Sequence, residues 1–155
     1  MLRLKNVITL GKLVAYGKDV LELQEQMMDG IVKNCYNIAD ISATWNAGGI
    51  IGGSNVEKTQ IKNCYNTGIV KSASNGALIG TYAIKSANMK YSFSLTGMAN
   101  ILGPGTIDST CGFKTENELK SDEIIQLLNQ ENDKVIWKKD QNNINKGYPI
   151  LYWQE

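Results

Sequence analysis

Apolar residues in the middle of this chain, residues 31–103, come in runs of no more than three, and polar residues or glycine separate one run from the next. A helical repeat needs about ten residues with a period of 3.6, yet residues 46–80 contain seven glycines, which destabilise helix interiors. The pattern therefore predicts short β-strands joined by turns of asparagine, serine and glycine. The predicted strands are residues 49–52, 59–61, 68–71 and 77–80.

One tetrapeptide recurs along this pattern. Asn-Cys-Tyr-Asn occupies residues 34–37 and 63–66, and a degenerate copy, Tyr-Ser-Phe-Ser, occupies residues 91–94. The second and third copies are offset by 28, and the first and second by 29, which places a one-residue insertion between Asn37 and Gly48. A fixed period of this length is typical of proteins in which each unit buries its apolar face by stacking on the next.

Stacked parallel strands lie about 4.8 Å apart, so equivalent residues of successive copies should lie above one another. The predicted core pairs are Ile50 over Leu78, Ile51 over Ile79, Ile61 over Met89 and Tyr65 over Phe93. The sequence thus predicts a mainly β fold. In detail it predicts a short parallel β-solenoid, right-handed and β-helix-like, with about three coils that follow the period of 28 to 29.

The two ends of the chain have a different pattern and predict caps on this solenoid. Residues 1–30 are expected to form an N-terminal cap of a strand and a short helix, the helix over residues 19–28, where apolar residues form a helical stripe. Residues 31–112 form the repeats, and residues 113–155 form an α/β C-terminal cap, so that the whole chain is one compact unit. Caps of this kind protect edge strands from aggregation.

The C-terminal cap carries clear helix signals. Thr115 and Glu118 match a capping box. Ser121 is placed to cap a second short helix, with Ile124, Leu127 and Leu128 facing inward. Beyond the helices, residues 135–137 and 148–153 read as strands around a loop at residues 142–147.

One motif is complete in residues 48–70: Gly-Gly-Ile-Ile-Gly, then Ile, then Asn-Cys-Tyr-Asn-Thr-Gly, then Val. This order resembles the GLUG repeat of bacterial surface and secreted proteins such as adhesins and some IgA-cleaving peptidases. The resemblance covers about residues 31–97, with departures in the first and third copies. The tail, with Trp137 and Gly-Tyr-Pro-x-Leu at residues 147–151, is similar to the segment that closes such repeats in surface proteins of gut-type Firmicutes. The resemblance implies a spacer or adhesive region.

The composition is typical of one soluble globular domain and argues against nucleic acid and membranes as partners. The 155 residues are 43% hydrophobic and carry 16 basic and 15 acidic side chains, a net charge of +1 that predicts no nucleic-acid partner. No apolar run approaches the roughly 20 residues of a membrane span. The start at Met1 does not read as a secretory signal. The chain is therefore either intracellular or, as we prefer, a piece of a longer exported protein located outside the cell or on its surface.

The repeated tetrapeptide offers thiols and amides as candidate site residues. The ladder residues are Asn34, Cys35, Tyr36 and Asn37 in one copy and Asn63, Cys64, Tyr65 and Asn66 in the next. Cys35 and Cys64 should lie about 5 Å apart, within reach of a disulfide, although stacked thiols are favoured, and Cys111 has no evident partner. We expect the asparagines to form amide ladders that satisfy turn backbone or each other, in preference to a calcium or sugar site.

The sequence does not determine which of these side chains point into the interior. Strict alternation would place Tyr65 on the side of Ile61, and a bend at Asn63 would turn Cys64 inward instead.

The remaining chemistry is sparse, and no cofactor or metal is expected. The absence of histidine removes histidine-based triads and most zinc sites. Residues 11–19 lack the spacing of a P-loop, and the glycines of residues 48–53 belong to the repeat rather than to a dinucleotide site.

Two further groups of residues bear on catalysis and sugar binding. The only acids between Ile31 and Phe113 fall in different parts of the repeat: Asp40, Glu57 and Asp108. Four aromatic residues of the tail, which fill the cap in the preferred interpretation, are also candidates for stacking on sugar rings. They are Trp137, Tyr148, Tyr152 and Trp153.

These observations predict a protein that is not an enzyme. The preferred function is a structural or adhesive module that binds a host surface protein or glycan, or acts as a spacer between other domains of a longer chain. The alternative is a carbohydrate-active enzyme of the β-helix type, a polysaccharide lyase or glycosidase, which would need acids that converge on one groove.

Overall fold

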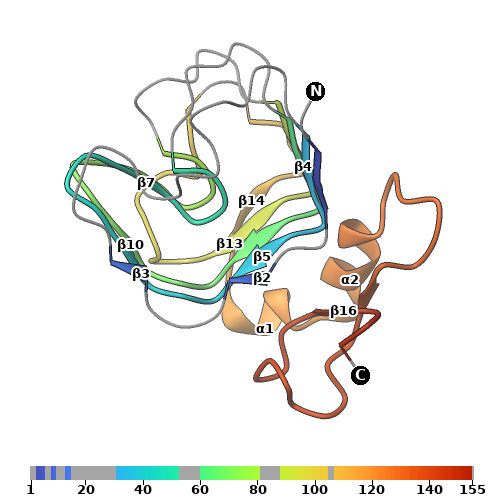
Figure 1. Ribbon diagram of the computed structural model, residues 1–155. Coiled ribbons are helices and arrows are strands. Elements are labelled where there is room, and N and C mark those ends of the chain that lie inside the picture. Colours follow the sequence, from blue (N-terminus) through green and yellow to red (C-terminus); the bar gives the residue numbers. More distant parts are fainter. Residues whose placement is uncertain are drawn as a thin grey trace.

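The computed structural model describes residues 31–52, 60–80, 88–104 and 107–154, together with the backbone of three strands near the N-terminus (Figure 1). In this part of the chain the protein is mainly β and its strands pair mostly in parallel. The predicted fold class is confirmed at this level. The helix predicted over residues 19–28 lies outside the described residues.

The parallel sheets are built from strands of successive copies of the repeat. In spatial order the four-stranded sheet contains β1 (Arg3–Lys5), β4 (Ile31–Lys33), β8 (Gln60–Lys62) and β12 (Asn88–Lys90). The five-stranded sheet contains β14 (Gly112–Lys114), β13 (Phe93–Leu95), β9 (Tyr65–Asn66), β5 (Tyr36–Asn37) and β2 (Ile8–Thr9). A three-stranded sheet contains β10 (Val70–Lys71), β6 (Ile41–Ser42) and β3 (Leu13–Val14). A two-stranded sheet contains β11 (Ser74–Gly76) and β7 (Asn46–Gly48).

The register of these strands confirms the period read from the sequence. Ile61 pairs with Met89, Tyr65 with Phe93, and Ile51 forms a bridge with Ile79. Ser42 pairs with Lys71, at an offset of 29, whereas Asn46 pairs with Ser74, at an offset of 28. The predicted insertion therefore lies in the turn at residues 43–45.

The paired strands extend beyond the repeats at both ends. Strands β1, β2 and β3 pair with β4, β5 and β6 at a constant offset of 28, so the sheets begin at Arg3 and not at residue 31. These three strands form a further copy of the repeat, which the tetrapeptide does not mark, because its place is taken by Asn6-Val7-Ile8-Thr9. Strand β14 pairs with β13, so the C-terminal cap begins at Thr115 rather than at residue 113.

A bend in each copy decides which side chains enter the interior. Asn34, Asn63 and Tyr91 have φ values of 56°, 55° and 47°, the left-handed region that asparagine tolerates better than most residues. The bend turns the next residue of each copy inward. These residues, Cys35, Cys64 and Ser92, are all buried. Of the two arrangements left open above, the bend at Asn63 is the one observed.

Two apolar clusters follow from this bend, one on each side of the five-stranded sheet. The interior cluster contains the predicted aliphatic pairs, and Val32 and Cys64 join them. The paired residues are Ile50, Ile51, Ile61, Leu78, Ile79 and Met89. The second cluster joins Tyr36, Tyr65 and Phe93 to residues of the C-terminal cap. The pairing of Tyr65 with Phe93 is therefore as predicted, but these rings pack under the cap and not inside the repeats.

Glycines of the repeat allow a close approach of backbone to backbone. A Cβ atom on Gly48 would overlap the carbonyl oxygen of Ile51, and one on Gly76 would overlap that of Ile79. The same clash at the same place in two copies explains why glycine occupies both positions.

The C-terminal cap, residues 115–154, lies beside the five-stranded sheet (Figure 1). It contains α1 (Glu116–Leu119), α2 (Asp122–Leu128) and an antiparallel pair of strands, β15 (Trp137–Lys138) and β16 (Ile150–Leu151). Both helix caps are as predicted, since Thr115 and Glu118 form the capping box and the Ser121 side chain accepts from Ile124 N. Ile124 and Leu128 of α2 are buried in the cluster between the cap and the repeats, and Leu127 packs against this cluster.

Candidate functional site

A cluster of polar and aromatic side chains lies where the C-terminal cap meets the repeats. Its centre is a column of rings from successive copies. Tyr36 and Tyr65 stack with ring centroids 5.0 Å apart and an angle of 7° between their planes. Trp137 of the cap packs against both at centroid distances of 5.9 and 5.4 Å. These stacked rings form the apolar part of the interface.

Each of the two tyrosine hydroxyls bonds to the cap. Tyr65 Oη donates to Pro149 O at 2.6 Å and accepts from Asn145 Nδ2 at 2.6 Å. Tyr36 Oη exchanges hydrogen bonds with the Gln154 side chain, accepting from Nε2 at 2.8 Å. Burial raises the pKa of Tyr65 well above its usual value, and the neighbouring Tyr36 adds to the increase. Tyr65 is therefore a neutral structural group at physiological pH.

The asparagines at the bend also hold the cap, which differs from the predicted amide ladder. Asn34 Nδ2 donates to Asn132 Oδ1 at 3.0 Å, and Asn34 Oδ1 accepts from Trp137 Nε1 at 3.1 Å. Asn63 Nδ2 donates to Gln130 O at 2.8 Å. The left-handed bend turns these two amides toward the cap, where backbone and side-chain partners replace the stacked neighbour.

The second asparagine of each copy follows the prediction. Asn37 Nδ2 donates to Ala39 O at 2.8 Å and to Asn66 Oδ1 at 2.7 Å. Asn66 repeats the turn contact by donating to Gly68 O at 2.8 Å. Asn37 and Asn66 therefore form the expected amide ladder and satisfy turn backbone at the same time.

The cysteines serve the same bend. Cys64 Sγ donates to Lys62 O at 3.1 Å and Cys35 Sγ to Lys33 O at 3.3 Å, while Ser92 Oγ makes the equivalent bond in the third copy. None of the three cysteines is in a disulfide. Burial, with Cys35 as the next cause, raises the pKa of Cys64 well above its usual value, and burial also raises the pKa of Cys111. Raised pKa values keep thiols protonated and unreactive.

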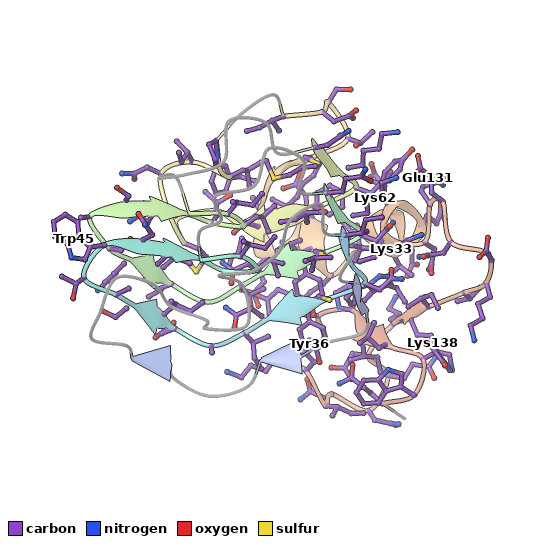
Figure 2. The ribbon with its side chains drawn as sticks, turned by 45° about the horizontal axis from the view of Figure 1, so that its top comes forward. Lys33, Tyr36, Trp45, Lys62, Glu131 and Lys138 are labelled. Atoms are coloured by element: carbon purple, nitrogen blue, oxygen red, sulfur yellow. The ribbon has the colours of Figure 1, made fainter. Side chains whose placement is uncertain are left out.

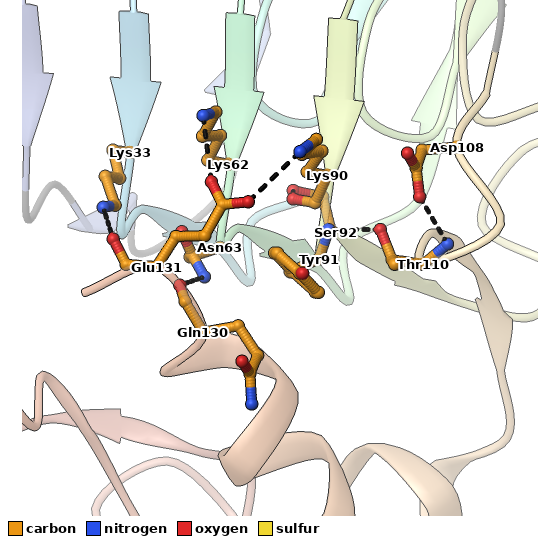
Figure 3. A network of polar contacts seen from close by, with 10 residues as sticks. All are labelled: Lys33, Lys62, Asn63, Lys90, Tyr91, Ser92, Asp108, Thr110, Gln130 and Glu131. Atoms are coloured by element: carbon orange, nitrogen blue, oxygen red, sulfur yellow. Dashed lines mark hydrogen bonds and ion pairs between the residues drawn. The ribbon is translucent and has the colours of Figure 1, made fainter.

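A column of lysines from successive copies lies at one edge of the same interface. The register places Lys5, Lys33, Lys62 and Lys90 side by side on the four-stranded sheet. Figure 3 shows the carboxylate of Glu131, in the turn after α2, between two of them: Glu131 lies 3.1 Å from Lys62 Nζ and 3.1 Å from Lys90 Nζ. Lys33 Nζ donates to the main-chain carbonyl of Glu131 at 2.5 Å.

Two groups at this edge, Glu131 and Lys90, have shifted pKa values. Hydrogen bonds from Lys62 and Lys90 hold the pKa of Glu131 below its usual range, and the bond to Glu131 raises the pKa of Lys90. All three side chains are partly exposed, so the ion pairs contribute little to stability in water. Lys62 and Lys90 thus form a partly exposed cationic surface that holds the carboxylate of Glu131.

Acids of the repeat region hold turns together. Asp40 Oδ1 accepts from Ile69 N of the next copy at 2.9 Å, and Asp108 Oδ1 accepts from Thr110 N at 2.8 Å. Hydrogen bonds from Thr110 lower the pKa of Asp108. Glu57 lies outside the described residues.

The four candidate aromatic residues separate into two groups. Trp137 and Tyr148 belong to the buried cluster under the cap. Tyr152 and Trp153 are 39% and 51% exposed, with Lys134 Nζ 4.9 Å from the centroid of the Tyr152 ring. Sequence reasoning did not select Trp45, which is 58% exposed in the insertion turn and lies across the molecule from Glu131 (Figure 2).

Sequence reasoning also missed the lysine column, although its signal was present. The lysines at positions 33, 62 and 90 have the spacings of 29 and 28 that the tetrapeptides have, and Lys5 precedes Lys33 by 28. Applying the period to charged residues as well as to apolar ones would have found the column.

The described residues contain neither a cluster suited to a metal ion nor a membrane-spanning helix. Among the described residues, no group of three or more histidine, cysteine or acidic side chains is arranged to hold a metal ion. No helix in the described ranges is both long and apolar enough to span a membrane.

Comparisons of the chain with models of protein families, with curated proteins and with solved structures gave no match.

Proposed function

We propose that this chain is a short parallel β-solenoid that acts as a non-catalytic adhesive module of a bacterial surface or secreted protein, where it binds a host surface protein or a glycan. The proposal depends on one observation: the polar side chains of the repeated tetrapeptide form hydrogen bonds within the protein itself. The amides of Asn37 and Asn66 close turns, those of Asn34 and Asn63 hold the cap, and the Cys64 thiol bonds to the main chain. Groups held in this way are parts of a scaffold.

The stacking of copies supports the solenoid. Each copy contributes strands to the same parallel sheets at an offset of 28 or 29. Repeat scaffolds of this kind present extended surfaces suited to binding. The resemblance of residues 48–70 to the GLUG repeat adds the context of the bacterial cell surface.

Exposed aromatic side chains favour adhesion over a spacer. Trp45 is 58% exposed and Trp153 is 51% exposed. Tryptophan is enriched among the residues that dominate binding energy, and its flat ring stacks on sugars and on protein surfaces. A spacer has no need of such side chains on its surface.

The rival function, a polysaccharide lyase or glycosidase, has less support. Its catalytic acids would have to be drawn from Asp40, Glu57 and Asp108 within the repeats. Asp40 accepts a backbone hydrogen bond from the next copy, and Asp108 accepts one within its own turn; a carboxylate held in this way is a poor general acid.

A binding screen against glycans and matrix proteins tests the adhesive function. We expect hits that Trp45→Ala or Trp153→Ala weakens, with Val135→Ala as a control that shortens another exposed apolar side chain. A folded protein with no hits would leave only the spacer role. Turnover of any polysaccharide in the screen would refute the non-catalytic assignment.

A further inference from the structure

We propose that the lysine column, Lys5, Lys33, Lys62 and Lys90, is the binding surface for a linear acidic polysaccharide whose uronate carboxylates lie between successive lysines. This inference rests on the proposed adhesive function and gives it a ligand class. Figure 3 shows Lys33, Lys62 and Lys90 on neighbouring strands, with Asp108 beyond Lys90.

The column concentrates positive charge that the composition does not reveal. The twelve residues of β1, β4, β8 and β12 contain five basic side chains and no acidic one. The chain as a whole has 16 basic and 15 acidic residues. Like charges directly opposite one another on adjacent strands repel and destabilise a sheet. A polyanion laid along the column would remove that repulsion.

Glu131 shows how a carboxylate fits this surface. Its two oxygens bond separately to Lys62 and Lys90, each at 3.1 Å, so a single carboxylate bridges two adjacent strands. Strands repeat about every 4.8 Å along the sheet, and the same bridging position therefore recurs between each pair of lysines. The contacts of the Glu131 carboxylate therefore indicate how the lysines would hold a uronate.

The charge pattern gives the column a direction. The bridge between Met89 and Ile107 places Asp108 next to Lys90 and closes that end with negative charge. Glu131 is bonded to Lys62 and Lys90, near the same end. The opposite end, with Lys33 and Lys5, extends onto β1, which also contains Arg3. We therefore expect a bound polymer to extend from Lys90 toward β1 and to compete with Glu131, whose carboxylate holds Lys62 and Lys90 and whose main-chain carbonyl holds Lys33.

The spacing favours a polyuronate over nucleic acid. Duplex DNA carries a negative charge about every 1.7 Å of its axis, several charges for each strand of this sheet. A polyuronate carries one carboxylate for each sugar ring, a repeat of the same order as the strand spacing. Single-stranded binding by nucleic-acid proteins also relies on exposed aromatic rings to stack the bases, and the described strands of this sheet, β4, β8 and β12, contain none.

The test measures binding of the full chain to polygalacturonate by affinity electrophoresis and titration calorimetry, with fully methyl-esterified polygalacturonate as the uncharged match. We expect the acidic polymer to bind and the ester to fail. Lys33→Gln and Lys62→Gln should each weaken binding about fivefold, the usual effect of one basic residue at an anionic surface. Lys71→Gln, which removes the same charge from the exposed face of β10, is the control and should bind normally.

Two further measurements keep the test independent of folding. For the unaltered protein, binding should weaken with salt, and the log–log slope should fall by up to about one unit for each lysine removed. Glu131→Gln should tighten binding, because it removes the carboxylate that occupies the column. An unchanged affinity in Glu131→Gln would refute the shared bridging position.

The outcomes separate this inference from the proposed function. Failure of the folded protein to bind polygalacturonate, equal binding of the ester, or equal loss in Lys71→Gln would overturn the lysine column as the site, while glycan hits elsewhere in the screen would leave adhesion standing. Equal binding of single-stranded DNA would overturn the polysaccharide assignment. Release of new reducing ends from bound polymer would instead overturn the non-catalytic function and leave the site intact.

Discussion

Replacing Tyr65 with phenylalanine tests whether the C-terminal cap is held by specific polar contacts with the repeats. The ring of Tyr65 would keep its stacking on Tyr36 at 5.0 Å. The change removes only the hydroxyl, which is fully buried and bonds to Pro149 O and Asn145 Nδ2, both at 2.6 Å. The substitution therefore isolates hydrogen bonding from ring packing.

The expected loss follows from what is left behind. A buried group that loses its partner costs about 1–3 kcal/mol. Asn145 Nδ2 also reaches Pro149 O, at 3.3 Å, so the two abandoned groups can still bond weakly to each other. We therefore expect Tyr65→Phe to lower the free energy of unfolding by about 2 kcal/mol, in the middle of that range.

Tyr36→Phe is the matched control, because Tyr36 occupies the same place in the neighbouring copy. Its partner Gln154 is partly exposed and also bonds to Leu151 N at 2.8 Å, so water can replace the lost hydroxyl. The expected loss is about 0.5–1 kcal/mol.

Urea unfolding followed by tryptophan fluorescence measures both variants, because Trp137 is fully buried against the two rings. Equal losses in Tyr65→Phe and Tyr36→Phe, or a loss in Tyr65→Phe below about 0.5 kcal/mol, would show that ring stacking alone holds the cap.

Four further outcomes are expected. Ile51→Asp or Ile79→Asp should prevent folding, because each buries an unpaired charge in the interior cluster; circular dichroism checks this, and Lys62→Ala, which loses one partly exposed ion pair, should cost no more than about 1 kcal/mol. Because Lys62 and Lys90 hold the pKa of Glu131 below its ordinary 4.5, the small stabilisation from these ion pairs is present above pH 4.5 and is lost as the pH falls below it; in a pH series of urea midpoints, the acid limb should become shallower in Glu131→Gln, and an unchanged limb would disprove the linkage. Burial raises the pKa of Tyr65 above 10.0, so stability should fall as the pH rises past 10, and Tyr65→Phe should fall less steeply; parallel alkaline profiles would contradict this. Cys64→Ser should stay folded with a small loss, since Ser92 makes the same bond in the third copy, and a thiol reagent should label Cys64 of the unaltered protein only upon unfolding; rapid native labelling would show that the bend is open.

The apolar and glycine pattern was sufficient to predict the pairing of the strands. Parallel strands align equivalent residues of successive copies, so the period of the repeat is enough to assign the partners of Ile61, Tyr65 and Ile51. Local sequence likewise determined the helix caps at Thr115 and Ser121, because capping depends on side chains within three or four residues.

The first three strands were not predicted as a copy of the repeat, because the prediction relied on the repeated tetrapeptide. β1, β2 and β3 keep the spacing of 28 but lack the tetrapeptide, and stacking requires a compatible shape and backbone rather than the same residue at each position. A motif search therefore finds fewer copies than the sheets contain.

The sequence by itself determined the period, the strand register and the caps, because each depends on near neighbours or on a regular spacing. Only the tertiary structure decided which face each residue of the tetrapeptide takes, since that depends on a left-handed φ at Asn34 and Asn63 that asparagine permits but does not require. The same bend turns Tyr36 and Tyr65 outward under a cap that is distant from them in the sequence. Stacking also gathers lysines one repeat apart in the sequence into one charged column, which net charge cannot show because it has no spatial content.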